Sequence, residues 1–231
     1  VQYYGPRIPG IIPEADIFLG VGEYAALPSL LDSSDYSGVN RPVVSRSVPR
    51  FPFNRLTHRR LSAPRHYAYL RIADGCDNRC SYCLIPRLRG PYQARSRETI
   101  LEEARWLTER GVRELILVAQ DTSYYGKKMG DSENLGNLLE ELSGIEACRW
   151  IRVLYAHPAH LGKRTLEAIA SSPRICSYLD LPIQHINDKI LKKMGRPAGR
   201  SKIEEVIKTA RKLVAGLSIR TTLMTGFPGE G

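Results

Sequence analysis

The sequence has no apolar segment long enough to cross a bilayer as a helix, which takes about 20 residues. It has no strict short repeat and no low-complexity tract. Its five cysteines in 231 residues are too few for a disulfide-rich scaffold, and no signal peptide opens the chain. These absences exclude membrane-spanning, fibrous and disulfide-stabilised classes. We expect a soluble cytoplasmic protein that does not bind membranes.

The chain also lacks an initiating methionine. It begins at Val1 and stops at Gly231, directly after a strand-like run at 217–225. We therefore expect a fragment of a longer protein, with sequence missing on both sides.

Three regions differ in composition. Residues 1–44 contain a Pro- and Gly-rich segment, an apolar run at 17–21 and a helical pattern at 24–31. They are predicted to be the C-terminal part of a small α/β domain. Residues 45–65 contain six arginines and three prolines, which predicts a basic extended linker. From residue 66 to 231 the pattern changes to strands that alternate with helices.

The alternating region predicts an α/β fold. Strands are predicted at 67–72, 114–119, 150–155, 177–181 and 218–224, and helices near 100–107, 135–142, 165–170 and 201–213. Ser96 is the predicted N-cap of the first helix, and Ser201 with Glu204 is a predicted capping box for the last. This order indicates right-handed βαβ units with a parallel sheet, whose functional sites collect at the carboxyl ends of the strands.

Three cysteines follow the first predicted strand. Cys76, Cys80 and Cys83 have the spacing C-x3-C-x2-C, and three thiolates on one loop can converge on one metal centre. Structural zinc normally has a fourth ligand, and none follows at a zinc-ligand spacing. Cys148 and Cys176 are isolated, and we expect them to be small buried apolar residues.

Three protein ligands on a cubane iron–sulfur cluster leave one iron open. An open iron can chelate a substrate or a cofactor, which is a catalytic feature. Zinc with a distant fourth ligand, or three unrelated thiols, are the alternatives.

The cysteine spacing, with Tyr82 before the last cysteine, resembles the signature of the radical S-adenosylmethionine (SAM) superfamily. The resemblance implies a 4Fe–4S cluster held by Cys76, Cys80 and Cys83, which would be both metal ligands and catalytic residues. It further implies that SAM binds the open iron and, on one-electron reduction, gives a 5′-deoxyadenosyl radical that abstracts hydrogen from an unactivated carbon. The implied fold is an incomplete (β/α)6-type partial TIM barrel.

Three segments resemble the methylthiotransferase family within this superfamily. The run 75–90 (GCDNRCSYCLIPRLRG) is similar to the family's cluster loop. The runs 118–126 (VAQDTSYYG) and 178–185 (YLDLPIQH) are similar to the branch that modifies the β-carbon of an aspartate in small-subunit ribosomal protein S-twelve. The alternatives are the branch that modifies adenosine in transfer RNA, and a zinc-stabilised module that binds RNA or the ribosome.

The resemblance extends over essentially the whole chain. It implies that 1–44 is the end of an N-terminal methylthiotransferase domain and that 66–231 is a radical SAM core cut before its last strand, with a C-terminal TRAM domain absent. A second 4Fe–4S cluster is expected only in the full-length protein, so this chain alone should not complete methylthiolation. An electron donor such as flavodoxin or ferredoxin is the expected redox partner.

Six further residues are expected to bind the cofactor: Tyr82, Gln120, Asp121, Gln184, Arg220 and Gly226. Gln120 and Asp121 could hydrogen-bond to the ammonium or carboxylate of SAM, or could form a satisfied turn. Arg220 could pair with the cofactor carboxylate, or could form a salt bridge beneath the barrel.

The remaining three are expected near the adenosine part of SAM. Tyr82 could contact the adenine or be a structural aromatic residue, and Gln184 is placed for the ribose hydroxyls. Gly226 lies in a Gly-Phe-Pro-Gly-Glu turn that resembles the family's turn, where glycine permits close backbone approach.

Two other patterns bear on metals and partners. His157 and His160 form an His-x2-His pair, for which we expect no metal role. The net charge of +10 and the basic runs at 46–65 and 87–97 are compatible with a ribosomal partner near RNA phosphates, and equally with solubilising charge. No aromatic-interleaved RNA-binding motif is present.

Overall fold

The computed structural model describes residues 4–15, 17–24, 27–32, 59–62, 64–128 and 134–230. Most of the predicted linker, at 45–58 and residue 63, lies outside the described residues.

The N-terminal region contains three short helical elements: η1 (Gly5–Arg7), α1 (Ile8–Ile11) and α2 (Leu27–Asp32). The last of these overlaps the helical pattern predicted at 24–31 and ends one residue later; residues 25 and 26 of that pattern are not described. The described residues of the apolar run at 17–21 form no regular helix or strand.

The five predicted strands are confirmed. They are β1 (Tyr67–Arg71), β4 (Glu114–Val118), β5 (Trp150–Val153), β6 (Tyr178–Asp180) and β7 (Ser218–Arg220). The first three pair in parallel in the order β1-β4-β5, and β6 pairs in parallel with β7. A parallel bridge between Ile151 and Ile175 connects β5 to the segment before β6. The α/β fold with a parallel sheet is therefore confirmed.

The strands end earlier than predicted at their carboxyl ends. Tyr155, inside the predicted range 150–155, has φ of 59°, a left-handed conformation that breaks an extended strand. Gln184, in the loop after β6, has φ of 69°. Such strained positions concentrate at functional sites, where surrounding contacts hold them. The early strand ends therefore mark the loops that build the site.

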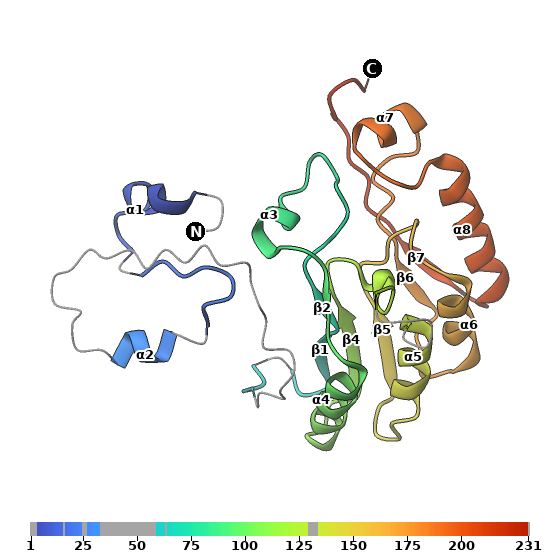
Figure 1. Ribbon diagram of the computed structural model, residues 1–231. Coiled ribbons are helices and arrows are strands. Elements are labelled where there is room, and N and C mark those ends of the chain that lie inside the picture. The colour runs from blue at the N-terminus through green and yellow to red at the C-terminus, as the bar shows by residue number, and fades with distance from the viewer. Residues whose placement is uncertain are drawn as a thin grey trace.

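Helices cover one face of the sheet (Figure 1). They are α4 (Arg97–Glu109), α5 (Leu135–Ser143), α6 (Lys163–Ser171) and α8 (Arg200–Leu213). In β1, Ala68 and Leu70 are buried in the core shared with these helices, whereas Tyr69 and Arg71 are exposed. The alternation follows from the two-residue period of a strand.

Several small elements were not predicted. A two-stranded antiparallel hairpin, β2 (Ala73–Asp74) with β3 (Gln93–Ala94), closes the base of the loop that carries the three cysteines. Within this loop lies α3 (Ile85–Arg89), and α7 (Asp188–Lys193) lies at the same end of the sheet, at the top of Figure 1. A 3-10 turn, η3 (Thr122–Tyr124), follows β4. These elements are too short to give a hydrophobic period.

Of the two predicted helix starts, the one at Ser96 is confirmed and the one at Ser201 is wrong. The side chain of Ser96 accepts a hydrogen bond from the backbone N–H of Thr99, which confirms it as the N-cap of α4. The predicted capping box of α8 is wrong, because Gly199 is the N-cap and makes no side-chain cap. Ser201 lies inside the helix, and the carboxylate of Glu204 accepts instead from Arg200 at 2.7 Å.

The remaining sequence expectations concern cysteines, the linker and membrane helices. Cys148 is buried as predicted, whereas Cys176 is only half-buried. Arg59, in the described end of the linker, donates to the carbonyl of Tyr69 at 2.6 Å and pairs with Glu103 of α4 at 3.3 Å. This end of the linker is therefore held against β1 and α4. No helix in the described part of the chain is long and apolar enough to span a membrane.

The two serines give a matched test of the helix starts. We expect Ser96→Ala to lower the free energy of unfolding by about 1 kcal/mol, because it removes a cap. We expect Ser201→Ala to change it by less than about 0.5 kcal/mol, as is usual at the surface. Chemical denaturation of both variants measures this, and equal losses would contradict the assigned starts.

Candidate functional site

The three cysteines lie on the loop that follows β2, at the carboxyl end of β1. All three are free thiols and half-buried. Burial raises the pKa of Cys76, while hydrogen bonds from the backbone and side chain of Asn78 act in the opposite direction. The thiol therefore keeps its proton at neutral pH, and a metal that binds there must displace it.

The start of the cysteine loop packs tightly against its end. Gly75 has φ of 74°, and a Cβ placed on it would lie 2.2 Å from the carbonyl oxygen of Pro91, so only glycine fits. The backbone N–H of Cys76 donates to the carbonyl of Gly90 at 3.2 Å. The Asp74 carboxylate accepts from the N–H of Gly75 at 2.8 Å.

The centre of the loop is held from the opposite side of the site. The Asp77 carboxylate accepts from the backbone N–H of Tyr92 at 3.1 Å and forms an ion pair with Lys128. Burial would raise the pKa of Asp77, but these two partners outweigh it and lower the pKa. The ionised carboxylate thus connects the cysteine loop to the residues after β4.

The segment between the second and third cysteines rests on the C-terminus of α7. The backbone N–H of Ser81 donates to the carbonyl of Met194 at 2.9 Å, and its hydroxyl donates to the carbonyl of Lys193 at 3.1 Å. These carbonyls belong to a helix end, where they have no intrahelical partner. Gly195, at φ 68°, comes so close that a Cβ on it would lie 2.6 Å from the carbonyl oxygen of Arg79.

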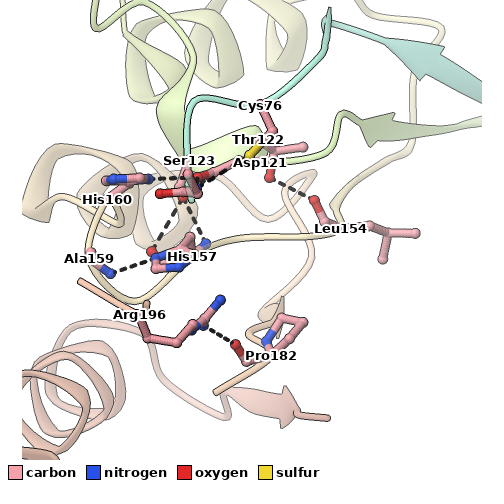
Figure 2. A network of polar contacts seen from close by, with 11 residues as sticks. Cys76, Asp121, Thr122, Ser123, Leu154, His157, Ala159, His160, Pro182 and Arg196 are labelled. Atoms are coloured by element: carbon pink, nitrogen blue, oxygen red, sulfur yellow. Dashed lines mark hydrogen bonds and ion pairs between the residues drawn. The ribbon is translucent and has the colours of Figure 1, made fainter. Parts of the chain in front are cut away.

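Asp121, directly after β4, is the centre of a buried network (Figure 2). Its carboxylate accepts from Asn78 at 3.1 Å, and the same Asn78 amide lies 3.5 Å from the sulfur of Cys76. It also contacts Nδ1 of His160 at 2.6 Å and accepts from the Ser123 hydroxyl at 2.6 Å. Burial alone would raise the pKa of Asp121, but the bonds from His160 and Ser123 outweigh it and lower the pKa.

His157 lies beside this network, after β5. Its backbone N–H donates to the Ser123 hydroxyl at 2.8 Å, and its Nδ1 accepts from the backbone N–H of Ala159 at 3.1 Å. Burial, and then the charge of Arg196, lower the pKa of His157 to about 3. The ring is therefore neutral at physiological pH, and its proton is on Nε2.

Asp121, His157 and His160 form a compact group, in which one potential ligand atom from each lies within 4.8 Å of the others. Their hydrogen bonds account for this compactness. Nδ1 of His157 already accepts from Ala159 and its Nε2 carries the proton, so neither nitrogen offers a lone pair. The arrangement is that of a hydrogen-bonded network.

Two of the predicted cofactor contacts have features that suit a ligand. The side-chain oxygen Oε1 of Gln120 is buried and has no partner among the described residues. The backbone of Gln184 is held in its left-handed conformation by bonds to Thr222 at 2.9 Å and from Met224 at 2.8 Å. A buried amide oxygen without a hydrogen bond costs free energy. The Oε1 atom of Gln120 can therefore accept a hydrogen bond from a bound ligand.

The other predicted contacts lie in more open surroundings. Arg220 has a side chain 61% exposed and lies 3.8 Å from the carboxylate of Asp180, so the expected alternative of an ion pair is present. Gly226 has φ of 76°, with no atom within 4 Å of a Cβ placed on it. Tyr82 is half-buried, and burial together with the nearby Cys80 raises its pKa to about 12.

Two residues of the site were not predicted from sequence. Asn78 connects Cys76 to Asp121, and its position between the cysteines was the available signal. Arg196 follows two lysines, and the sequence alone indicates part of a solvated basic run. In the structure its Nη2 donates to the carbonyl of Pro182 at 2.7 Å, and its Nε is buried with no hydrogen-bond partner among the described residues.

Comparison with known proteins gives the class to which this site belongs. The model of the radical SAM superfamily matches residues 70–231, which include the cysteine loop and all five strand ends. The chain therefore belongs to the radical SAM superfamily.

Within this superfamily the chain resembles one group of curated proteins. It is 46% identical over 235 residues to the ribosomal protein uS12 methylthiotransferase RimO of Syntrophus aciditrophicus (strain SB), a match that covers 99% of this chain and 51% of that protein. It is 42% identical to the protein of the same name from Heliobacterium modesticaldum, over 99% of this chain and 49% of that one. The chain spans about half the length of these relatives. The predicted resemblance to the methylthiotransferase family is confirmed.

Solved structures support the fold. The radical SAM methyltransferase TsrM from Kitasatospora setae, solved with cobalamin and a [4Fe-4S] cluster, has a TM-score of 0.59 at 18% identity, covering 75% of this chain and 36% of that one. The cobalamin-dependent radical enzyme OxsB has a TM-score of 0.57 at 13% identity, covering 69% and 24%. At these identities the likeness is one of fold alone.

The contact of Gly195 with the cysteine loop can be tested against a matched glycine. Gly195→Ala and Gly216→Ala both place a side chain at positive φ, but only the first meets another segment, since Gly216 has no atom within 4 Å of an added Cβ. We expect Gly195→Ala to accelerate alkylation of Cys80 several-fold, because the loop must move away. Mass spectrometry of labelled thiols measures this, and equal rates in both variants would contradict the contact.

The burial of neutral His157 predicts a pH-dependent stability. The unfolded ring takes up a proton below its pKa of about 6.5, whereas the folded ring stays neutral down to about pH 3. The unfolded state therefore binds more protons in this window, and stability falls as the pH is lowered through it, by up to about 1.4 kcal/mol per pH unit.

The measurement is denaturation between pH 7 and 4.5 for the wild type, His157→Gln, and the control His66→Gln, whose ring is exposed. We expect the pH slope to decrease in His157→Gln and to stay as in the wild type in His66→Gln. An unchanged slope in both would show that His157 is not buried as a neutral ring.

Proposed function

We propose that the protein containing this chain is a radical SAM methylthiotransferase that adds a methylthio group to the β-carbon of an aspartate in uS12, the small-subunit ribosomal protein S-twelve. The observation that carries the proposal is the loop with Cys76, Cys80 and Cys83, fixed at the carboxyl end of β1 in a chain of this superfamily. The substrate is taken from the names of relatives that are 39–46% identical.

The residues of the site suit a 4Fe–4S cluster with SAM. Three free thiols on one loop are the donor set that leaves one iron of a cubane cluster open. The unpartnered Oε1 of Gln120 is a ready acceptor for the ammonium group of SAM. When bound, cluster and SAM supply the one-electron chemistry that removes a hydrogen atom from an unactivated carbon, and the protein supplies orientation and exclusion of water.

Asp121 contributes to this chemistry by positioning. Its carboxylate oxygens already accept hydrogen bonds from Asn78, Ser123 and His160. Its main role is therefore to fix the cysteine loop in position, and it would not hold the cofactor by itself. Tyr82, Gln184, Arg220 and Gly226 stay proposed cofactor contacts.

The wider organisation is part of the proposal. Residues 1–44 would be the end of a methylthiotransferase domain, 45–65 a linker and 66–231 the radical SAM core. A second 4Fe–4S cluster would belong to the full-length protein. The expected partners are uS12 on the ribosome, with RNA phosphates nearby, and a flavodoxin or ferredoxin as electron donor, which implies a cytoplasmic location.

Cluster assembly gives the first test. After anaerobic reconstitution with iron and sulfide, we expect the wild type to gain the absorption of thiolate-ligated iron and close to four iron atoms per chain. Cys80→Ala should lose both, while the control Cys176→Ala, at a half-buried cysteine outside the loop, should keep both. Zinc at one per chain without iron would contradict the proposal and favour a zinc-stabilised binding module.

The substrate gives the second test. The full-length protein is incubated with SAM and a reductant, in parallel with 30S subunits and with transfer RNA. We expect mass spectrometry to detect the replacement of one aspartate hydrogen of uS12 by a methylthio group. Modification of adenosine in transfer RNA, with uS12 unchanged, would assign the chain to the other branch of the family.

A further inference from the structure

Asn78, between the first two cysteines of the loop, makes two contacts through one side-chain nitrogen. Its Nδ2 lies 3.1 Å from the carboxylate oxygen Oδ2 of Asp121 and 3.5 Å from the sulfur of Cys76. An ionised carboxylate can only accept, so the amide nitrogen faces it, and the second hydrogen of that nitrogen is left for the sulfur. The side chain therefore connects a proposed cluster ligand to a buried carboxylate.

The donor is held in place from both sides. Asp121 is 2% exposed and also accepts from Ser123 and His160, each at 2.6 Å, so it does not follow the loop if the loop moves. Asn78 also bonds to the sulfur of Cys76 through its backbone N–H. Two donors of one residue thus point at the same sulfur, which Figure 2 shows beside the Asp121 network.

Such a donor acts on the electronic properties of a cluster. Hydrogen bonds to the sulfur ligands are among the factors that set the reduction potential of an iron–sulfur cluster. Reduction adds one negative charge, and a hydrogen bond becomes stronger as its acceptor becomes more negative. A donor that is already fixed at the sulfur therefore stabilises the reduced cluster more than the oxidised cluster, and it raises the potential.

We propose that Asn78 sets the reduction potential of the cluster by donating from its side chain to the sulfur of Cys76, while Asp121 holds the amide in the required orientation. The inference rests on the proposed function, because it takes Cys76 as a cluster ligand. Its consequence is that the cluster accepts an electron at a less negative potential than the same three thiolates would without the amide. Asn78 is thus a positioning residue that acts through Cys76.

The test is a redox titration of the reconstituted protein without SAM, in which electron paramagnetic resonance measures the reduced cluster. Asn78→Leu keeps a side chain of similar size but removes both side-chain N–H donors. The controls are Ser123→Ala, which also removes a hydrogen bond from Asp121, and Ser81→Ala, which also removes an anchor of the cysteine loop. In the described part of the chain neither hydroxyl bonds to a cysteine sulfur.

At a fixed potential, we expect Asn78→Leu to lower the ratio of reduced to oxidised cluster about tenfold, which for a one-electron couple is a midpoint about 59 mV more negative. Each control should change the ratio by less than about threefold, because the bond to the sulfur stays in place. An unchanged or higher potential in Asn78→Leu, or an equal shift in either control, would overturn the inference.

A second measurement serves if Asn78→Leu assembles no cluster. Wild-type protein with 15N only in the side-chain amides of asparagine is reconstituted and reduced, and pulsed electron paramagnetic resonance records the nitrogen coupled to the unpaired electron. We expect a 15N coupling that protein with unlabelled asparagine lacks, and no such coupling would overturn the inference.

Neither measurement uses a substrate. A protein that shows both effects of Asn78 but modifies no aspartate therefore contradicts the proposed function alone. A cluster whose potential does not depend on Asn78 contradicts this inference alone, and a wild type that assembles no iron–sulfur cluster contradicts both.

Discussion

The buried carboxylate of Asp121 accepts hydrogen bonds from three separate segments of the chain: Asn78 in the cysteine loop, Ser123 in its own loop and His160 after β5. An ionised carboxylate in this position is tolerable only with several donors around it. None of the three segments can therefore move without leaving a buried charge unsatisfied. This constraint fixes the cysteine loop against the ends of β4 and β5.

The same loop is held at its other points by backbone groups that would otherwise lack partners. Carbonyls at the C-terminal end of α7 accept from Ser81, and Gly75 and Gly195 permit backbone contacts that a Cβ would prevent. The three thiols are thus presented by a loop with little freedom. Preorganisation of this kind is what a metal centre with one open position needs.

Sequence patterns predicted the fold well because each long strand and helix has its own apolar period. The three cysteines could be proposed as a site from sequence because they are neighbours on one loop. The pattern of Ser201 and Glu204 failed, since the helix begins earlier, at Arg200 with Gly199 as its N-cap, and Glu204 pairs with Arg200. Arg196 could not be found from sequence. Its role depends on what packs around it, and a lysine-rich helix end gives no hint that one nitrogen is buried.

The central claim is that the three-cysteine loop holds a cluster whose fourth iron is open to SAM. The most direct measurement is the electron paramagnetic resonance spectrum of the reduced, reconstituted protein with and without SAM. The account predicts that SAM changes the spectrum, because the cofactor enters the coordination of one iron. An unchanged spectrum with SAM in excess would contradict it.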